Sequence, residues 1–277
     1  MGVDQSTPAP SRAGRNLPAA IAVGVGLGAV IIGSLIWQKS LFVLVVLAAV
    51  LAAVDELVRV FHNSGAKLSR IPLFAGTTAM LVAAYYGGPL ALLVALALTA
   101  LATIFWRMPG GSIGFVRDVT TNVFLLGYVP LLAGFAILLV QPEDDGPQRV
   151  VTFFLVVVAS DVGGYVAGVL FGKHPMAPTI SPKKSWEGFA GSTVACVGAG
   201  IGSVVWLLDG HWWVGAIVGA VAVLTATVGD LAESMIKRDL GIKDMSNLLP
   251  GHGGVMDRLD SLLATAPAVW LLLHLLV

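Results

Sequence analysis

The stretch SMIKRDLGIKDMSNLLPGHGGVMDRLD, residues 234–260, gathers polar side chains within an otherwise apolar chain. It holds four basic side chains, four carboxylates, a histidine and a Gly-Gly pair, and apolar runs flank it on both sides. Charged groups at the end of a membrane segment are unfavourable unless they have a role, so such a cluster predicts a functional site. We therefore interpret the flanking runs as membrane-spanning and the stretch as a site near one membrane surface.

The composition of the whole chain supports a membrane protein. Of its 277 residues 57% are hydrophobic and only 12% are charged, whereas a soluble domain has about 25% charged residues. The period-two alternation of a β-barrel is absent, and helices satisfy their own backbone hydrogen bonds in lipid. The sequence predicts an all-α polytopic integral membrane protein with about nine transmembrane helices, near 17–36, 41–61, 71–86, 88–106, 119–140, 149–171, 189–208, 211–236 and 254–277.

The organisation along the chain has three parts. Residues 1–16 are predicted to be a disordered N-terminal tail, 17–148 to form N-terminal transmembrane helices, and 149–277 to form the catalytic transmembrane region. The tight Gly87-Gly88-Pro89 region leaves eight or ten spans as alternatives. The run 17–36 has no A-x-A-like cleavage site after it, so a retained first span is favoured over a signal sequence.

The basic residues predict the orientation of the chain. With the N-terminus inside, Lys39, Arg149 and the acidic loop 143–145 fall outside. We expect a cell (inner) membrane location with the active site facing the cytoplasm. The basic residues expected inside are Arg12, Arg15, Arg59, Lys67, Arg70, Arg107, Arg117, Lys173, Lys183, Lys184, Lys237, Arg238, Lys243 and Arg258.

An aspartate interrupts an apolar span in the motif Ser160-Asp161-Val162-Gly163-Gly164-Tyr165. The repeat of Gly164, Gly168 and Gly172 at four-residue spacing is also typical of a helix-packing seam. Packing accounts for the glycines but leaves an intramembrane carboxylate unexplained. We expect Asp161 to face a polar cavity.

Two adjacent lysines follow a proline in Ser181-Pro182-Lys183-Lys184, before the expected start of a helix. A helix N-terminus preceded by lysines is suited to binding phosphate. An anionic-lipid patch or a topology signal is an equally good interpretation of this loop. The nearby segment 168–173 does not have P-loop spacing, and no strand pattern precedes it.

The principal stretch and the helix before it contain carboxylates at helical spacing. Asp230, Glu233, Ser234 and Lys237 would share one helix face, as Asp257 and Asp260 would on the last helix. Carboxylates from facing helices can hold Mg²⁺, which prefers oxygen ligands. The glycines 251, 253 and 254 permit a sharp turn and close backbone approach to an anion. Simple ion pairs, Lys237 with Glu233 and Arg258 with Asp257, are the alternative.

These residues resemble the phosphatidate cytidylyltransferases, also called CDP-diacylglycerol synthases. That family's signature contains Ser, Lys-Arg, Lys-Asp, Pro, a Gly-Gly turn, Asp-Arg and a final Asp, and no motif position of this chain departs from it. The elements at 160–165 and 180–188 are also similar to the family, so the resemblance covers roughly residues 150–277. The matching residues are Ser234, Lys237, Arg238, Lys243, Asp244, Pro250, His252, Gly253, Gly254, Asp257, Arg258 and Asp260.

The resemblance implies transfer of a cytidylyl group from CTP to phosphatidic acid, with Mg²⁺ as cofactor in a site for one or two metals. It also implies a lipid-bilayer environment and favours a homodimer, while the zero net charge gives no support for nucleic acid. Rival functions are a CTP-dependent lipid kinase and, less favoured, a transporter. We predict catalytic roles for Asp230, Lys237, Arg238, Asp257 and Asp260, and metal binding by Asp230, Asp257, Asp260, Asp161 and Glu233. Predicted substrate contacts are Ser181, Lys183, Lys184, Ser234, Lys237, Arg238, Lys243, Asp244, His252, Gly253, Gly254 and Arg258.

Overall fold

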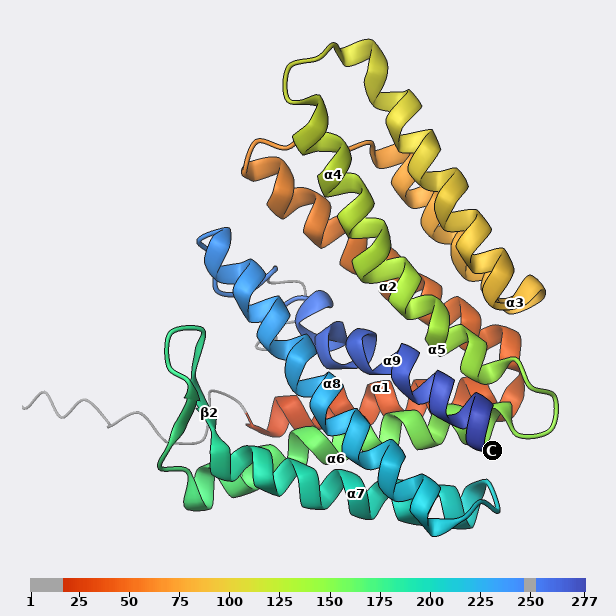
Figure 1. Cartoon of the computed structure of the whole chain (residues 1–277), viewed down its shortest axis with the longest axis vertical. Helices are drawn as coiled ribbons and strands as arrows, with labels where there is room; N and C mark the ends of the chain where they lie inside the picture. The colour runs from red at the N-terminus through yellow and green to blue at the C-terminus, as the bar shows by residue number, and fades with distance from the viewer. Residues whose placement is uncertain (1–16, 247–252) are drawn as a thin grey trace, which may run out of the picture.

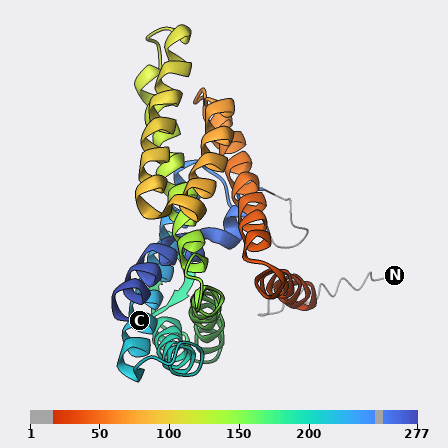
Figure 2. The same ribbon diagram turned by 90° about the vertical axis from the view of Figure 1, so that its right-hand side faces the viewer.

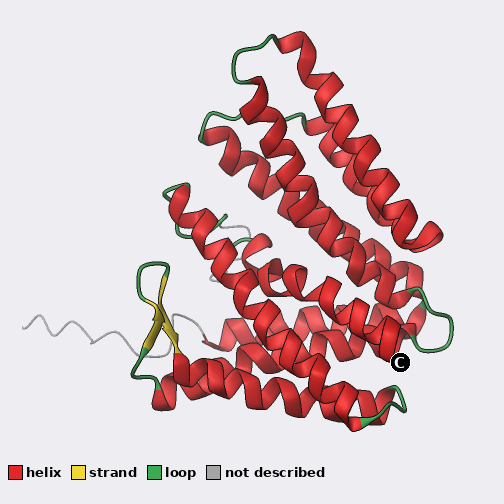
Figure 3. Ribbon diagram, in the orientation of Figure 1, coloured by secondary structure: helices red, strands yellow, loops and turns green. Residues whose placement is uncertain are grey.

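The computed structural model describes residues 17–246 and 253–277, and nearly all of them are helical (Figure 3). The prediction of an all-α polytopic membrane protein is confirmed. The predicted tail 1–16 and His252 lie outside the described residues. The α-helices are α1 (Leu17–Trp37), α2 (Lys39–Asn63), α3 (Arg70–Arg107), α4 (Phe115–Leu126), α5 (Leu132–Val140), α6 (Gly146–Phe171), α7 (Trp186–Leu207), α8 (Trp212–Asp239) and α9 (Met256–Leu276).

A short antiparallel hairpin lies between α6 and α7. Its strands are β1 (Pro175–Ala177) and β2 (Ser181–Ser185). Two further short elements extend helices: the 3₁₀ turn η1 (Met108–Gly110) follows α3, and the π-helical turn η2 (Gly127–Leu131) joins α4 to α5. The hairpin was not predicted.

Seven helices in the described part of the chain are long and apolar enough to cross a membrane, so the expected count of about nine is not confirmed. One of the seven, Arg70–Gly110, has 41 residues, about twice the length that a span requires. Gly88 interrupts it with φ 71°, next to Pro89. A Cβ atom on Gly76 would lie 1.9 Å from Thr99 Cγ2, so the two arms of α3 fold back against each other (Figure 1).

The helices form two adjoining groups. Helices α2, α3, α4 and α5 extend together away from the group α6 to α9, as the two perpendicular views show (Figures 1 and 2). Helix α9 lies where the groups meet and contacts α2, α5, α6 and α8. The fully buried core side chains include Leu57, Leu81, Leu125, Ile137 and Phe153.

Small residues bring the backbones of α6, α7, α8 and α9 into contact. A Cβ atom on Gly191 would lie 2.7 Å from the carbonyl oxygen of Gly163, which joins α7 to α6. At Gly215 it would lie 2.4 Å from the Gly200 carbonyl oxygen, and at Gly229 2.6 Å from that of Asp260. Close approach of this kind is how helices pack in lipid, where apolar burial gives no driving force.

Groups predicted to share the outer side lie at one end of the molecule. Lys39 Nζ donates a hydrogen bond to the Glu143 carbonyl oxygen at 3.0 Å, and Arg149 Nε to Asp145 Oδ1 at 2.8 Å. Arg149 Nη1 also donates to the carbonyl oxygen of Leu273 at the C-terminal end of α9. The polar stretch precedes the other end of α9, about 30 Å away for a helix of this length.

Three basic residues predicted to lie on the inner side meet at one buried carboxylate. Arg107 Nε donates to Asp118 Oδ2 at 2.8 Å, and the Lys67 amide and Arg117 Nε donate to Asp118 Oδ1 at 3.0 and 3.3 Å. This network connects the start of α4 to the end of α3 and to the loop between α2 and α3. Which side of a membrane these loops face stays a prediction.

Candidate active site

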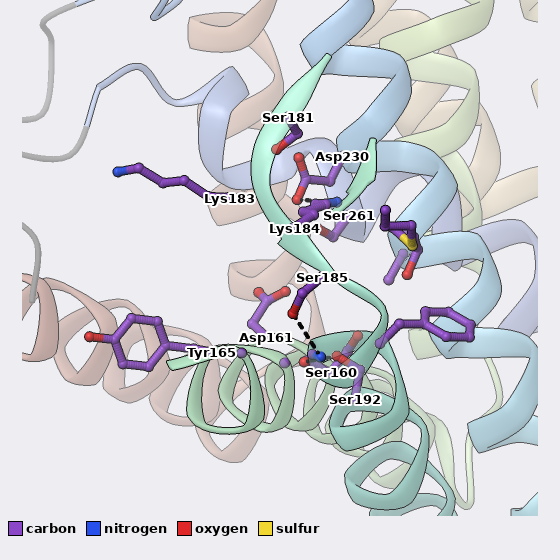
Figure 4. Close-up of a pocket in the computed structure, with 17 residues that line it drawn as sticks. Ser160, Asp161, Tyr165, Ser181, Lys183, Lys184, Ser185, Ser192, Asp230 and Ser261 are labelled. Atoms are coloured by element: carbon purple, nitrogen blue, oxygen red, sulfur yellow. Dashed lines mark hydrogen bonds and ion pairs between the residues drawn. The ribbon is translucent and has the colours of Figure 1, made fainter. Parts of the chain in front are cut away.

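Two polar cavities adjoin between α6, the β1–β2 hairpin, α8 and α9. Their volumes are about 300 Å³ and about 410 Å³, and Asp161, Asp230 and Ser261 line both. Figure 4 shows the first cavity, with β2 crossing it and side chains from α6 and α8 directed towards the strand. The three polar motifs of the C-terminal half therefore all contribute side chains to this site.

Asp161 faces this polar site, as the sequence predicts. Its neighbour Ser160 lines the smaller cavity too, and the Ser160 carbonyl oxygen accepts a hydrogen bond from Ser192 Oγ of α7 at 2.6 Å. A Cβ atom on Gly164 would lie 2.5 Å from the same Ser192 Oγ. The glycines do form a packing seam, and Asp161 lies on the open side of the same helix.

Lys184 is the lysine of the pair that enters the site. Its Nζ lies 2.6 Å from Asp230 Oδ2 of α8, whereas Lys183 points away from this pair (Figure 4). Alternate residues of a strand point to opposite sides, so β2 separates the two lysines. Ser234 Oγ lies 3.4 Å from Asp230 Oδ1, one helical turn further on, and Ser181 lines the same cavity.

The N-terminus of α7 is capped by its own residues. Ser185 Oγ accepts a hydrogen bond from the Gly188 amide at 3.1 Å. Glu187 Oε2 accepts from the amides of Lys173 and His174 at 3.1 and 3.2 Å, and His174 Nδ1 lies 2.6 Å from Glu187 Oε1. These contacts fix the hairpin to the start of α7 and so fix the position of Lys184.

Lys237 joins α8 to α9 through two carboxylates. Its Nζ lies 2.9 Å from Asp257 Oδ1 and also pairs with Glu233, which is fully buried. Asp257 Oδ2 accepts the amides of Gly254 at 2.7 Å and of Met245 at 3.0 Å. The ion-pair alternative for Lys237 and Glu233 is therefore correct, and a metal-binding role for Glu233 or Asp257 stays a prediction.

Glu56 of α2 is a site residue that the sequence analysis missed. This buried carboxylate accepts hydrogen bonds from the Val255 and Met256 amides, both at 2.9 Å, and from Ser246 Oγ at 2.5 Å. A Cβ atom on Gly254 would lie 2.6 Å from Glu56 Oε2, which explains why a glycine stands there. The argument that singled out Asp161, a carboxylate within an apolar span, applies equally to Glu56.

Five carboxylates line the larger cavity: Asp161 of α6, Asp230 of α8, Asp257 and Asp260 of α9, and Asp244 of the loop after α8. The close approach at Gly229 brings α8 against the Asp260 backbone, which places Asp230 beside that part of α9. Within residues 17–246 and 253–277, no three acidic, histidine or cysteine side chains converge tightly enough to form a metal centre. The donor chemistry nevertheless fits a hard divalent cation, because carboxylate oxygens are its preferred protein ligands.

The other predicted residues lie around this centre. Arg238 Nε contacts the Ile180 carbonyl oxygen of the hairpin at 3.4 Å. Lys243 is exposed, while Asp244 and Arg258 line the larger cavity. Gly253 has φ 80°, so the turn before α9 requires a glycine. The structure brings Asp161, Lys184, Asp230, Asp260 and Arg258 together and leaves Lys243 at the periphery. Lys183 lines the smaller cavity, but its side chain points away from Asp230 (Figure 4).

The sequence of this chain is similar to those of known proteins. A sequence model of the cytidylyltransferase family matches residues 18–276. A phosphatidate cytidylyltransferase of Mycobacterium leprae is 45% identical over 288 aligned residues, which cover 98% of this chain and 92% of that protein. One of Mycobacterium tuberculosis is 45% identical over 279 residues, with 96% and 85% covered. One of Pseudomonas aeruginosa is 38% identical over 202 residues, with 70% and 74% covered.

These matches include the N-terminal half, for which the sequence analysis found no signature. They also include the helices that supply Glu56, Asp161, Asp230 and Asp260. On this evidence, the chain belongs to the cytidylyltransferase family.

Proposed function

We propose that this protein transfers the cytidylyl group of CTP to phosphatidic acid, giving CDP-diacylglycerol and pyrophosphate. The proposal rests on family membership and on one observation of the structure. Carboxylates of three helices line one polar site at the end of membrane helices, together with the cationic side chains Lys183, Lys184, Lys237 and Arg258. Such a site suits two anionic substrates, of which one comes from water and the other from the bilayer.

In this reaction a phosphate oxygen of phosphatidic acid attacks the α-phosphorus of CTP. A new P–O bond forms, the bond from the α-phosphorus to the bridging oxygen of the β-phosphate breaks, and pyrophosphate leaves. No covalent enzyme intermediate is needed, so the protein acts by holding both phosphates in line and by stabilising negative charge. Lys184 and Arg258 bind and orient these phosphates.

We also propose that Asp161, Asp230 and Asp260 would hold Mg²⁺. When bound, the ion polarises phosphate oxygens and offsets charge on the leaving pyrophosphate. Lys184, which pairs with Asp230, would exchange that carboxylate for a substrate phosphate. Lys237 pairs with Glu233 on its own helix and with Asp257 on α9, and so holds α8 against α9.

The cellular arrangement completes the proposal. The site opens towards the cytoplasm of a cell membrane, because CTP is available there and because basic loops concentrate on that side. A homodimer follows from the family resemblance. Gly24 and Gly28 on α1 leave open space at the spacing that suits a close helix pair, whereas most glycines of α6 to α8, such as Gly163, Gly191 and Gly215, already contact a neighbouring helix.

Product identification with the purified protein tests the reaction. With CTP labelled at the α-phosphorus, the label should enter the lipid, and one pyrophosphate should appear for each lipid product. A lipid kinase would instead transfer the γ-phosphoryl group, leave the α-label in CDP and release no pyrophosphate. Absence of labelled lipid from an intact, folded preparation supplied with Mg²⁺ contradicts the proposal.

A further inference from the structure

An apolar cavity of about 340 Å³ adjoins the polar site. Five helices line it, namely α1, α2, α5, α6 and α9, so both groups of helices contribute to its walls. Its walls include Phe42, Ala49, Ala136, Phe154 and Leu262. Of the residues that line it, Arg258 alone is charged or polar.

Arg258 is common to the apolar cavity and to the larger polar cavity. The lining residues of α9 that follow it are Leu259, Leu262, Leu263 and Ala266. They extend over eight residues, which corresponds to about 12 Å along a helix. The apolar cavity therefore begins at the cation of the polar site and runs along α9 away from it.

These features restrict what the cavity can hold. Water needs two to four polar partners to occupy a buried space, and this lining offers none beyond Arg258. A nucleotide is equally unsuited to apolar walls. A hydrocarbon chain joined to an anionic group fits this lining. The chain would contact the apolar walls, and the anionic group would contact Arg258.

We propose that this cavity holds one acyl chain of phosphatidic acid, with the lipid phosphate at Arg258 on the border of the polar cavity. The inference rests on the proposed function for the identity of the lipid. It makes the apolar cavity the part of the protein that senses acyl-chain length. It also places the headgroup in the space that Asp161, Asp230 and Asp260 line.

The test fills the cavity from two of its walls. Ala136→Phe on α5 and Ala49→Phe on α2 each add a ring to the space, and Ala97→Phe adds the same ring at an exposed position of α3 outside the lining. Turnover is measured with phosphatidic acids that carry short or long acyl chains in mixed micelles. Either filling variant should lower kcat/KM for the long-chain lipid by about tenfold, which corresponds to two methylene groups losing burial. The short-chain value and the KM for CTP should stay within about twofold of wild type, and Ala97→Phe should match wild type throughout.

Equal losses for both lipids, or no loss for either, would overturn the inference. If a phenylalanine prevents folding, Ala136→Leu gives the same comparison with a smaller side chain. Thermal unfolding with added lipid separates the two proposals. If wild type makes no product, but long-chain phosphatidic acid raises its Tm and Ala136→Phe removes that rise, the proposed reaction fails and the lipid site stands. An equal rise with phosphatidylcholine of the same chain length would overturn the assignment of the anionic headgroup to Arg258.

Discussion

Glu56 Oε2 accepts the backbone N–H of Met256 at 2.9 Å, across 200 positions of the sequence. A carboxylate of the N-terminal half thus holds the first turn of the helix that carries Asp260. Carboxylates stabilise helix N-termini because unpaired amides point out of the first turn. The N-terminal half therefore contributes directly to the geometry of the site.

We expect Glu56→Gln to lower both stability and activity. The amide keeps the size of the side chain but loses the negative charge that the Val255 and Met256 amides contact. A hydrogen bond to a charged group contributes about 1.5–3 kcal/mol, so thermal unfolding should show a clear decrease in Tm. The neighbouring Asp55→Asn is the matched control, since Asp55 pairs with the exposed Arg59, and such surface pairs contribute about 1 kcal/mol or less. Equal effects of the two substitutions would show that Glu56 has no special role.

We expect Asp260→Asn to lower turnover alone and Asp257→Ala to lower stability as well. Both aspartates line the larger polar cavity, and loss of Asp260 should reduce kcat by about 100-fold or more and leave the Tm nearly unchanged. Asp257 pairs with Lys237 and caps two backbone amides, so its loss should also destabilise the fold by about 2–4 kcal/mol. Turnover and thermal unfolding on the same preparations separate the effects. A folded Asp260→Asn protein with wild-type turnover at ordinary Mg²⁺ would refute the assignment.

The two adjacent lysines should also differ. Lys184→Ala should lower kcat/KM for CTP by about 10- to 150-fold, which matches the loss of one contact between charged groups. We expect the loss to appear mainly in the KM for CTP. Lys183→Ala should have a much smaller effect, because β2 directs that side chain away from Asp230. Steady-state kinetics with each substrate varied in turn decides the matter, and a change confined to the KM for lipid would favour the anionic-lipid patch instead.

Sidedness can be tested with cysteines in a background where Cys196 is replaced. Cysteines at Lys173 and Ser246 should be shielded from impermeant thiol reagents in intact cells, whereas a cysteine at Asp144 should be labelled. The first two positions belong to the end with the polar site, and Asp144 belongs to the loop whose carbonyl groups bind Lys39. Labelling in the reverse pattern would require the opposite topology.

Local sequence predicted the parts of the site that depend on hydropathy and helical spacing. Asp161 stands out because it interrupts an apolar span and Asp230 because of its spacing to Glu233 and Lys237, and both aspartates line the polar cavities. Spacing could not distinguish Asp257 from Asp260, because their roles depend on the path of the preceding loop, whose amides Asp257 accepts. The β1–β2 hairpin was missed because its strands have only three and five residues, one of them with two lysines. Likewise, helical periodicity predicts two spans in α3 but cannot show that Gly88 lets them fold back on each other.

The glycine contacts among α6, α7, α8 and α9 have a mechanical consequence. Where backbone rests on backbone, as at Gly191 with Gly163 and Gly215 with Gly200, there are no side chains whose rotamers could absorb a displacement. These four helices should therefore move as one stiff block that keeps Asp161, Asp230 and Asp260 in register. The more deformable side of the molecule is then that of α1 and α2, which pack through branched and aromatic side chains that can change rotamer. If phosphatidic acid enters the proposed site from the bilayer, we expect these helices to part there while Asp161, Asp230 and Asp260 keep their positions.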